Sequence, residues 1–346
     1  MTKYIVRRLL QAVPLLLVIS LILFLMLQAV GDPLATLGGR VPPRAEDRQR
    51  LARQLGLDKP VMMQYVFWLI GNDWAMVVDS DGDGVDDAYG ERRGVLRGDF
   101  GESIMVRGKP AIDIIMEKLP NTLLLMVTSE IVIIVLSLTI GVYSAVRQYS
   151  LMDNVFTTIS FILFSMPIFW MALMLLYIFA VNLKLAGSPI YFPSIGMYDV
   201  IAGPTIQQVA WHLVLPVMTI SLISVAGYSR YIRSIMLEVL SSDYIRTARA
   251  KGISQRRVLY IHALKNASLP LVTLIGLDLP LLLGGAVVTE KIFGWPGMGS
   301  TYITHLDRSD FPVLMAILMM ISVAVVFFQL TTDIVYTWLD PRIRYS

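Results

Sequence analysis

The sequence of 346 residues contains no cysteine and only three histidines, and charged residues make up just 16% of it. The absence of cysteine excludes disulfide scaffolds, thiolate nucleophiles and iron–sulfur or zinc–thiolate sites. The formal net charge is only +3, and the 29 lysines and arginines are spread over several segments. No nucleic acid is therefore expected as a partner.

Apolar residues are abundant instead. They make up 55% of the chain, and the mean hydropathy is +0.65. A water-soluble domain of this length could not bury so much apolar surface. The apolar residues also gather in blocks of about 20, which is the length of helix that crosses a hydrocarbon core of about 30 Å. The sequence therefore predicts an integral membrane protein that lies in a lipid bilayer.

Six apolar blocks are long enough to cross the membrane. We predict a transmembrane helix in each, because a helix satisfies its backbone groups within one segment, whereas a β-barrel needs short strands of alternating polarity. The predicted fold class is an all-α polytopic membrane protein with six transmembrane helices. The predicted spans are Leu9–Val30, Asn121–Val146, Val155–Asn182, Trp211–Ile235, Leu269–Thr289 and Pro312–Trp338.

Basic residues give the orientation, because Lys and Arg in short loops stay on the cytoplasmic side. Between Arg230 and Lys265 there are eight Lys and Arg against two acidic residues, and both termini also carry basic residues. We therefore expect both termini and the segment 237–268 in the cytoplasm. The chain then consists of a tail and first helix (1–30), an external cap (31–120) and a five-helix core (121–346).

The predicted cap contains a Gly- and Asp-rich stretch with the spacing of a calcium-binding loop. Four aspartates stand at positions 1, 3, 5 and 9 of an EF-hand-like loop, with Gly84 at position 6: Asp79, Asp81, Asp83 and Asp87. This spacing wraps a chain around a hard cation, so calcium is a candidate ligand. However, position 12 is Gly90, Glu91 comes one residue late, and no flanking helices are expected. A solvated acidic turn remains the alternative.

Two acidic residues lie well inside predicted spans. Ionisable groups in the bilayer are costly, so Glu130 and Asp278 are candidates for the lining of a polar path. The alternative is that they hydrogen-bond neighbouring helices and are only structural. Glu290 lies at a span end and is expected to reach headgroups or water.

A Gly-rich loop follows the fifth predicted span. Trp295, Pro296 and Met298 form a compact apolar group in it. We consider them candidate contacts for a docked external protein. The alternative is a turn that only packs against the cap.

The cytoplasmic segment is predicted to be helix, turn, helix. Ser241 and Ser242 are candidate caps of a first helix, Gly252 is a candidate left-handed end, and Ser254 is a candidate cap of a second helix that runs toward Asn266. Ala248 and Gly252 lack bulk, so another protein could approach the backbone there. By composition alone, a solvated basic loop beside anionic lipid headgroups is the alternative.

Several further motifs stand in order along the chain with this segment: Tyr4–Leu10 with Gly31–Pro33, Gly98–Ser103, Leu119–Thr122, Asp243–Gly252, His262–Ala267, Thr289–Gly299 and Asp340–Tyr345. The sequence of the cytoplasmic segment resembles the "EAA" loop of binding-protein-dependent ABC importer permeases, in particular the dipeptide, oligopeptide and nickel branch. Together the motifs extend this resemblance over nearly the whole chain. Two positions depart from the general motif, because Arg246 stands at its Glu and Thr247 at its first Ala.

This resemblance implies a type I ABC importer permease for peptides or a similar small solute, located in the cell inner membrane. It implies that the cytoplasmic helices dock into a groove on an ATPase. The implied coupling residues are Arg246, Thr247, Ala248, Arg249, Gly252, Arg256 and His262. It also implies a second homologous permease subunit, two ABC ATPase subunits and an external solute-binding protein as partners.

The chain contains no Gly-x4-Gly-Lys-Ser/Thr loop, since its only Gly-Lys pair, Gly108-Lys109, is followed by Pro110. ATP and magnesium are therefore expected on the partner ATPases, and no cofactor is expected in the chain itself apart from the calcium considered above. A membrane-embedded enzyme is a rival hypothesis, but neither His-Glu-x2-His nor Gly-x-Ser-x-Gly occurs. A receptor or scaffold that uses the cap is the second rival.

Overall fold

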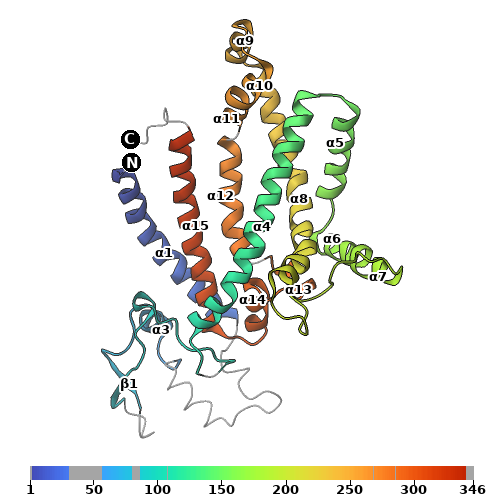
Figure 1. Cartoon of the computed structure of the whole chain (residues 1–346). Helices are drawn as coiled ribbons and strands as arrows, with labels where there is room; N and C mark the ends of the chain where they lie inside the picture. Colours follow the sequence, from blue (N-terminus) through green and yellow to red (C-terminus); the bar gives the residue numbers. More distant parts are fainter. Residues whose placement is uncertain are drawn as a thin grey trace. The chain divides into compact units, whose positions relative to one another are not determined.

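The computed structural model describes residues 2–30, 57–79, 86–106, 108–267, 269–284 and 286–339. Within this part of the chain the only strands form one short hairpin, and helices dominate (Figure 1). The chain divides into two compact units. Unit 1 is 1–120 with 301–323, and unit 2 is 121–300 with 324–346.

Five helices among the described residues are long and apolar enough to cross a membrane: Tyr4–Ala29, Ala111–Val146, Ile168–Leu185, Ile206–Ser241 and Phe311–Tyr336. The predicted class, a helical membrane protein, is confirmed. The count of six spans stays a prediction, because helix α12 (Leu269–Leu283) has only 15 residues.

Unit 1 is built around apolar contacts between α1 (Thr2–Val30), α3 (Val61–Ile70) and the first part of α15 (Phe311–Leu339). Phe24 of α1 meets the ring of Tyr65 edge-on at 5.6 Å, and Tyr65 stacks on Trp68 at 6.0 Å. Met315 of α15 belongs to the same cluster. Three segments far apart in sequence therefore share one core, and α3 is held against the end of α1.

The chain after α3 forms a small non-helical layer of unit 1. Strands β1 (Met76–Val78) and β2 (Ala88–Tyr89) pair antiparallel, with Met76 opposite Tyr89 and Val78 opposite Ala88. A one-turn helix, η1 (Val95–Arg97), follows. Arg97 donates to both carboxylate oxygens of Asp73 at 2.6 Å and to the carbonyl of Ile70 at 2.7 Å, so it closes the end of α3.

Unit 2 is a bundle in which α4 (Ala111–Val146, from Asn121 on), α8 (Ile206–Ser241) and α12 share an apolar core. Thr205 caps α8, because its hydroxyl accepts from the N–H of Gln208. Pro216 lies inside α8 and lacks the N–H that would bond to the carbonyl of His212. At 1.5 Å per residue, the 36 residues of α8 extend over about 54 Å.

The third predicted span is not one continuous helix. Helix α5 (Leu151–Phe164) ends before Pro167, and α6 (Ile168–Leu175) begins after it. Proline has no N–H and disfavours a helical conformation at the preceding residue, which explains the break. A π-helical stretch η2 (Leu176–Asn182) and α7 (Leu183–Leu185) follow, and α6 and α7 run across the direction of α5 (Figure 1).

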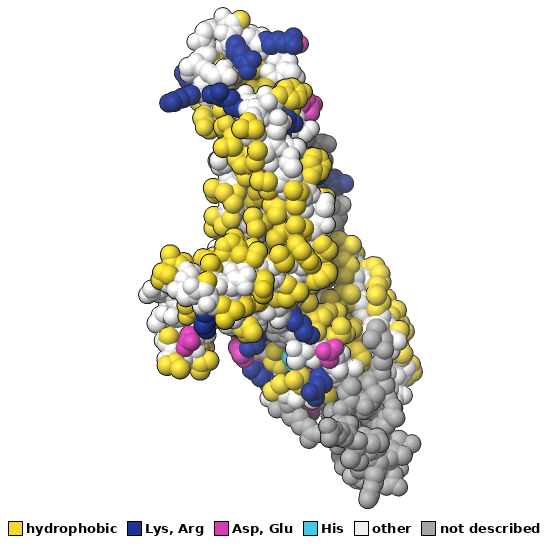
Figure 2. All heavy atoms as spheres, turned by 90° about the vertical axis from the view of Figure 1, so that its right-hand side faces the viewer, with side chains coloured by type: hydrophobic (Ala, Val, Ile, Leu, Met, Phe, Trp, Pro, Cys, Tyr) yellow, Lys and Arg dark blue, Asp and Glu magenta, His cyan; other side chains and the backbone are white. Residues whose placement is uncertain are grey.

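The surface of unit 2 has the distribution expected of a membrane domain. Apolar side chains cover the middle of the face shown in Figure 2, and basic side chains gather at the end that carries helices α9 and α10. Many of the apolar side chains are large and exposed, among them Phe161, Phe164, Phe169 and Tyr177. Hydrocarbon chains rather than water suit such a surface.

Candidate functional site

The segment 241–267, which was predicted to be cytoplasmic, contains the amphipathic helix α9 (Asp243–Ala250). Ile245 is fully buried and Ala248 nearly so, and both belong to the core of unit 2. Arg246, Thr247 and Arg249 point outward and are exposed. One face of α9 is thus fixed to the bundle, and the other presents positive charge.

Gly252 ends this helix in the predicted left-handed conformation, with φ of +76°. Its N–H bonds to the carbonyl of Arg249 at 2.9 Å, and the N–H of Ile253 bonds to the carbonyl of Ala248 at 3.2 Å. This pair of hydrogen bonds is a Schellman motif, which suits glycine because positive φ is strained for other residues. A Cβ at Gly252 would meet no atom within 4 Å, so its exposed side is open.

The second half of the segment is helical from Gln255 to Ala267, in three consecutive pieces: α10 (Gln255–Arg257), the π-helical η3 (Val258–Ala263) and α11 (Leu264–Ala267). Val258 and Ala263 are fully buried in the core that also contains Ile245. Arg256 is exposed, whereas His262 is half-buried. The helix–turn–helix prediction is confirmed.

The predicted caps and the predicted opening at Ala248 are wrong. The hydroxyl of Ser242 does not cap α9 but donates to the carbonyl of Val239 at 2.6 Å, and Ser241 lies inside α8. Ser254 precedes α10, but its side chain makes no capping hydrogen bond there. The small side chain of Ala248 serves the packing of α9 inside the chain, because only 8% of the residue is exposed. The open approach to this segment is therefore at Gly252 and not at Ala248.

An ion pair between Asp153 and Arg233, which the sequence analysis missed, joins α5 to α8. Asp153, only 1% exposed, accepts from Nε and Nη2 of Arg233, both at 2.9 Å. It also accepts from the N–H of Tyr149, while its own N–H donates to Ser150. The Ser-x-x-Asp pattern of residues 150–153 is a capping signal that predicts the helix start, but not the partner 80 residues away.

The two predicted path residues come from α4 and α12 and lie in unit 2. Tyr228 of α8 donates a hydrogen bond to Asp278. Glu130 is close enough to interact electrostatically with both groups. The structure thus brings Glu130 and Asp278 into one polar cluster inside the bundle.

Glu130 is only 4% exposed, and neither of its carboxylate oxygens has a hydrogen-bond partner among the described residues. The hydroxyl of the neighbouring Ser129 is also buried without a partner there. Unsatisfied polar groups in an apolar bundle are costly. This arrangement gives no support to a purely structural role for Glu130, in which a neighbouring helix would satisfy it.

The Gly-rich loop is organised around Glu290 of α13 (Val287–Ile292). The expectation that Glu290 reaches water is wrong, because it is fully buried. It accepts from Thr122 at 3.3 Å and from the N–H of Ser300 at 2.8 Å. Burial raises the pKa of Glu290, and these hydrogen bonds counteract the rise. Sequence periodicity gave no signal for this contact, since Thr122 is 168 residues away.

The three predicted external contact residues belong to this loop. Trp295 and Met298 are fully buried. The indole N–H of Trp295 donates to the carbonyl of Asn121 at 3.0 Å, and the side chain of Asn121 donates to the carbonyl of Pro296 at 2.9 Å. Pro296 is half-buried. The loop is packed against the start of the α4 part of unit 2, which belongs to the predicted five-helix core and not to the predicted cap. Contact of the loop with an external protein stays a prediction.

The aspartate-rich loop connects β1 to β2, so strands and not helices flank it. The N–H of Asp87 bonds to the carbonyl of Val78 at 2.9 Å, which brings the two ends of the loop together. Asp81 and Asp83 lie outside the described residues. Asp79 and Asp87 are described, but no group of three metal-ligating side chains occurs among the residues that the structure places.

Ser103, His305 and Asp310 form a cluster in unit 1. These residue types also form the catalytic triads of hydrolases, so the geometry of the cluster decides whether it could be one. Asp310 is fully buried and accepts from Ser103, from His305 at 2.8 Å and from the N–H groups of Ile104 and Met105 at 3.1 Å. Catalysis requires the histidine to contact the serine. Here the aspartate stands between them, so the cluster fastens a loop and is no catalytic triad.

Comparison with protein families matches both parts of the chain to transport proteins. Residues 137–345 match the family described as binding-protein-dependent transport system inner membrane component. Residues 1–126 match the family of the N-terminal part of such membrane components.

Similar proteins extend over the whole chain. The oligopeptide transport system permease protein AppB of Bacillus subtilis is 40% identical over 346 residues, which is 100% of both chains. The dipeptide transport system permease protein DppB of Escherichia coli K12 is 34% identical over 363 aligned residues, and the glutathione transport system permease protein GsiC of Salmonella choleraesuis is 33% identical over 351. Both alignments cover 100% of each chain.

Proposed function

Because the chain belongs to the family of binding-protein-dependent transport system inner membrane components, we propose that it forms one half of the translocation path of an ATP-driven importer for peptides. Membership makes the chain a multi-pass membrane permease subunit and not an enzyme, as the motif resemblance implied. The family also implies ATPase and solute-binding partners. The rival hypotheses of a receptor, scaffold or membrane enzyme gain no support.

Peptides are the proposed solute class because of one observation. Relatives aligned over the full chain carry the names of oligopeptide, dipeptide and glutathione systems. Uptake by the reconstituted transporter would test this class. Radiolabelled dipeptides and tripeptides should be taken up in an ATP-dependent manner, and an equimolar mixture of free amino acids should not compete. Uptake that free amino acids or sugars abolish would contradict the proposal.

We propose that the segment 241–267 is the contact with the ATPase. Its inner face is anchored by Ile245, Val258 and Ala263, so a force applied to the outer face reaches the bundle directly. Its outer face carries Arg246, Thr247, Arg249, Gly252 and Arg256. Within the described part of the chain the Arg246 side chain has an exposed contact of 3.6 Å with Asp243, so its charge remains accessible to a partner. Ala248 is buried and His262 is half-buried, so we place both beneath this outer face.

Charge reversal tests this contact without disturbing the fold. The double variant Arg249→Glu/Arg256→Glu changes two exposed side chains, and it should lower both ATPase co-purification and uptake at least tenfold. Arg147, an exposed arginine between α4 and α5, provides the matched control, and Arg147→Glu should stay within twofold of the wild type. Full ATPase retention and normal uptake in the double variant would contradict the proposal.

The finer composition of the complex is also a proposal. We expect a second homologous permease subunit, two ABC ATPases that hold ATP and magnesium, and an external solute-binding protein. The lack of a phosphate-binding Gly-x4-Gly-Lys loop in the sequence supports ATP binding on a separate chain. Mass measurement of the purified complex would give this composition directly.

We propose a cytoplasmic location for both termini and for the segment 241–267. This segment and α13 lie at opposite ends of α8 (Figure 1), which extends over more than the thickness of a hydrocarbon core. The loop that holds Trp295, Pro296 and Met298 would then be external. It would support an exposed surface that includes Lys291 and Gly294, against which the solute-binding protein docks.

Glu130 and Asp278 are proposed to border the solute path. Glu130 lacks a hydrogen-bond partner among the described residues, and a peptide ammonium group would supply one. Glu130→Gln should therefore lower uptake of Ala-Ala-Lys more than uptake of an N-acetylated tripeptide. Equal effects on both peptides would contradict a role in contact with the solute.

Calcium in the cap remains a proposal for the loop that contains Asp79, Asp81, Asp83 and Asp87. The support is the spacing of the four carboxylates and the closure of the loop by the β1–β2 hairpin. Calcium should raise the unfolding temperature of the wild type but not of Asp81→Asn/Asp83→Asn. The absence of a calcium effect on the wild type would end the proposal.

A further inference from the structure

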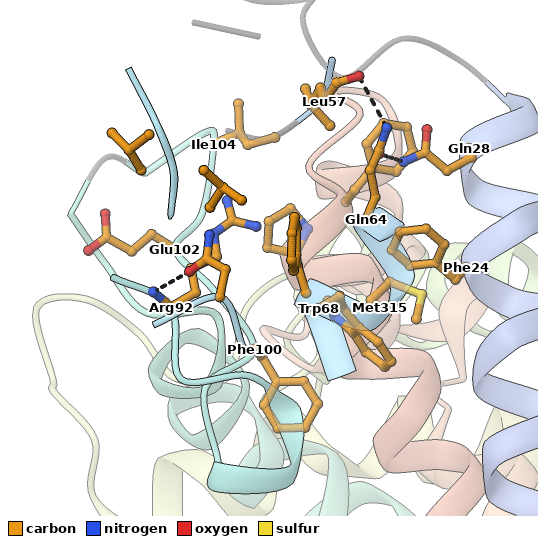
Figure 3. Close-up of a pocket in the computed structure, with 16 residues that line it drawn as sticks. Phe24, Gln28, Leu57, Gln64, Trp68, Arg92, Phe100, Glu102, Ile104 and Met315 are labelled. Carbon is orange, nitrogen blue, oxygen red and sulfur yellow. Dashed lines mark hydrogen bonds between the residues drawn. The ribbon is translucent and has the colours of Figure 1, made fainter. Parts of the chain in front are cut away.

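A pocket in unit 1 lies outside all the sites considered so far. It opens between the end of α1, helix α3, the segment 92–104 and the start of α15 (Figure 3). Its volume is about 110 Å³. A cavity of about 150 Å³ holds a benzene ring, so this one suits a group about the size of an aliphatic side chain.

The wall of the pocket is mostly apolar. Phe24, Phe67, Trp68, Phe100 and Met315 contribute to it, and Phe67, Trp68 and Met315 are buried in the protein core. An apolar group that enters the pocket would leave water and meet side chains already fixed by packing. Concave apolar pockets with a few polar groups at their edges are the usual form of a small-molecule site.

Two opposite charges border the same pocket. Arg92 and Glu102 lie on one side of it in Figure 3. In the part of the chain that the structure describes, no ion pair within 4.0 Å joins Arg92 to a carboxylate. Burial lowers the pKa of the Arg92 guanidinium, and the negative charges of Asp99 and Glu102 counteract this effect. The guanidinium therefore remains a cation with donors available to a ligand.

The backbone of Arg92 is held firmly. Its carbonyl accepts from the N–H of Asn72 at 3.0 Å, and its N–H donates to the Asn72 side chain at 2.9 Å. Gly71 allows this close approach, since a Cβ there would lie 2.5 Å from the Arg92 carbonyl oxygen. The position from which the Arg92 side chain extends is thus fixed before any ligand binds.

We propose that this pocket binds a free aliphatic amino acid such as leucine, with its side chain in the cavity, its carboxylate at Arg92 and its ammonium group at Glu102. A zwitterion matches two separated charges that do not pair with each other, and an aliphatic side chain matches the volume and the wall. The site would make the cap a sensor of amino acids that is separate from the peptide path.

Binding of L-leucine, leucinamide and N-acetylleucine to the purified full-length chain in lipid nanodiscs tests the proposal. Leucinamide lacks the carboxylate and N-acetylleucine lacks the ammonium group. Each should bind at least tenfold more weakly than leucine, because each loses one charge-assisted contact. Equal binding of the three compounds, or no saturable leucine binding at millimolar concentration, would overturn the proposal. Tighter binding of N-acetylleucine would overturn it as well, in favour of a peptide carboxyl terminus.

Paired variants identify the residues. Arg92→Gln should weaken leucine binding at least tenfold and remove the preference over leucinamide, and Glu102→Gln should remove the preference over N-acetylleucine. The exposed neighbours serve as controls, since Arg93→Gln and Glu91→Gln should leave both preferences intact. Unchanged preferences in the first two variants would contradict the assignment.

The wild-type comparison does not depend on any variant folding. The assay contains no ATPase and measures no transport, so its failure would leave the proposed transport function untouched. Conversely, a chain that binds leucine in this pattern but supports no peptide uptake would refute only the transport proposal.

Discussion

Removal of the Asp153 carboxylate should loosen the attachment of α5 to α8. The wild-type contact has two hydrogen bonds of 2.9 Å from Arg233 to a carboxylate that is only 1% exposed. Removing one partner of a buried ion pair typically costs about 3–5 kcal/mol, because the other charge is left uncompensated. The Arg233 side chain is 25% exposed and regains some hydration, so the lower end, about 3 kcal/mol, applies to Asp153→Ala.

A double-mutant cycle separates the ion pair from the other contacts of Asp153. Asp153→Ala also removes the hydrogen bond from the N–H of Tyr149, worth about 1 kcal/mol, and Arg233→Met keeps the apolar stem of the side chain. The double variant Asp153→Ala/Arg233→Met leaves no uncompensated charge and should be about 2 kcal/mol more stable than Asp153→Ala alone.

Denaturant unfolding of the purified chain in detergent micelles, followed by circular dichroism, would measure these differences. Asp243→Ala is the control, since among the described residues the Asp243 carboxylate has an exposed contact of 3.6 Å with Arg246, and its removal should cost less than about 1 kcal/mol. If the two single effects simply add in the double variant, the pair does not hold α5 on α8 and the reasoning fails.

The remaining predictions concern two other buried acids. Glu290→Ala should destabilise unit 2 by about 3 kcal/mol in the same unfolding assay. The substitution leaves the hydroxyl of Thr122 and the N–H of Ser300 without the acceptor that Glu290 provides. The neighbouring Thr289→Val should be neutral or stabilising, since the Thr289 hydroxyl is buried without a partner among the described residues, and a large loss of stability would refute this account. Burial alone would raise the pKa of Asp310, but its hydrogen bonds, from His305 first, hold that pKa below the ordinary value near 3.8. A carboxylate whose pKa is lower in the folded state than in the unfolded state stabilises the fold at pH values above its unfolded-state pKa. This stabilisation is lost as the pH falls through the folded-state pKa. The unfolding-temperature gap between wild type and Asp310→Asn should therefore close as the pH falls below about 4, and a constant gap down to pH 2 would contradict the assignment.

Much of the helical layout could be predicted from local sequence. Apolar length located the long helices, and Gly252 marked the end of α9 because only a residue tolerant of positive φ suits that position. Pro167 was a local signal for the break between α5 and α6. One continuous span was predicted instead, because the residues on both sides of this proline are apolar. Composition reports burial in lipid, not the continuity of a helix.

The polar contacts could not be predicted in the same way. Glu290 was expected to reach water, yet it is buried because Thr122 and Ser300 satisfy it, and Thr122 is distant in sequence. Ala248 was interpreted as an opening for a partner because it is small, but the same property allows tight packing within one chain. A single residue type fits both roles, and only its neighbours in space distinguish them.

Pro216 gives α8 a mechanical property of its own. The missing hydrogen bond makes this a position at which the helix can bend, and 25 residues separate it from Ser241, which is about 38 Å of helix. A swing of only about 10° at that joint would carry the far tip through an arc of about 7 Å, more than one helical turn. The long helix would thus convert a small change of angle among the membrane helices into a large displacement of the segment 241–267, for which contact with the ATPase is proposed, and the reverse.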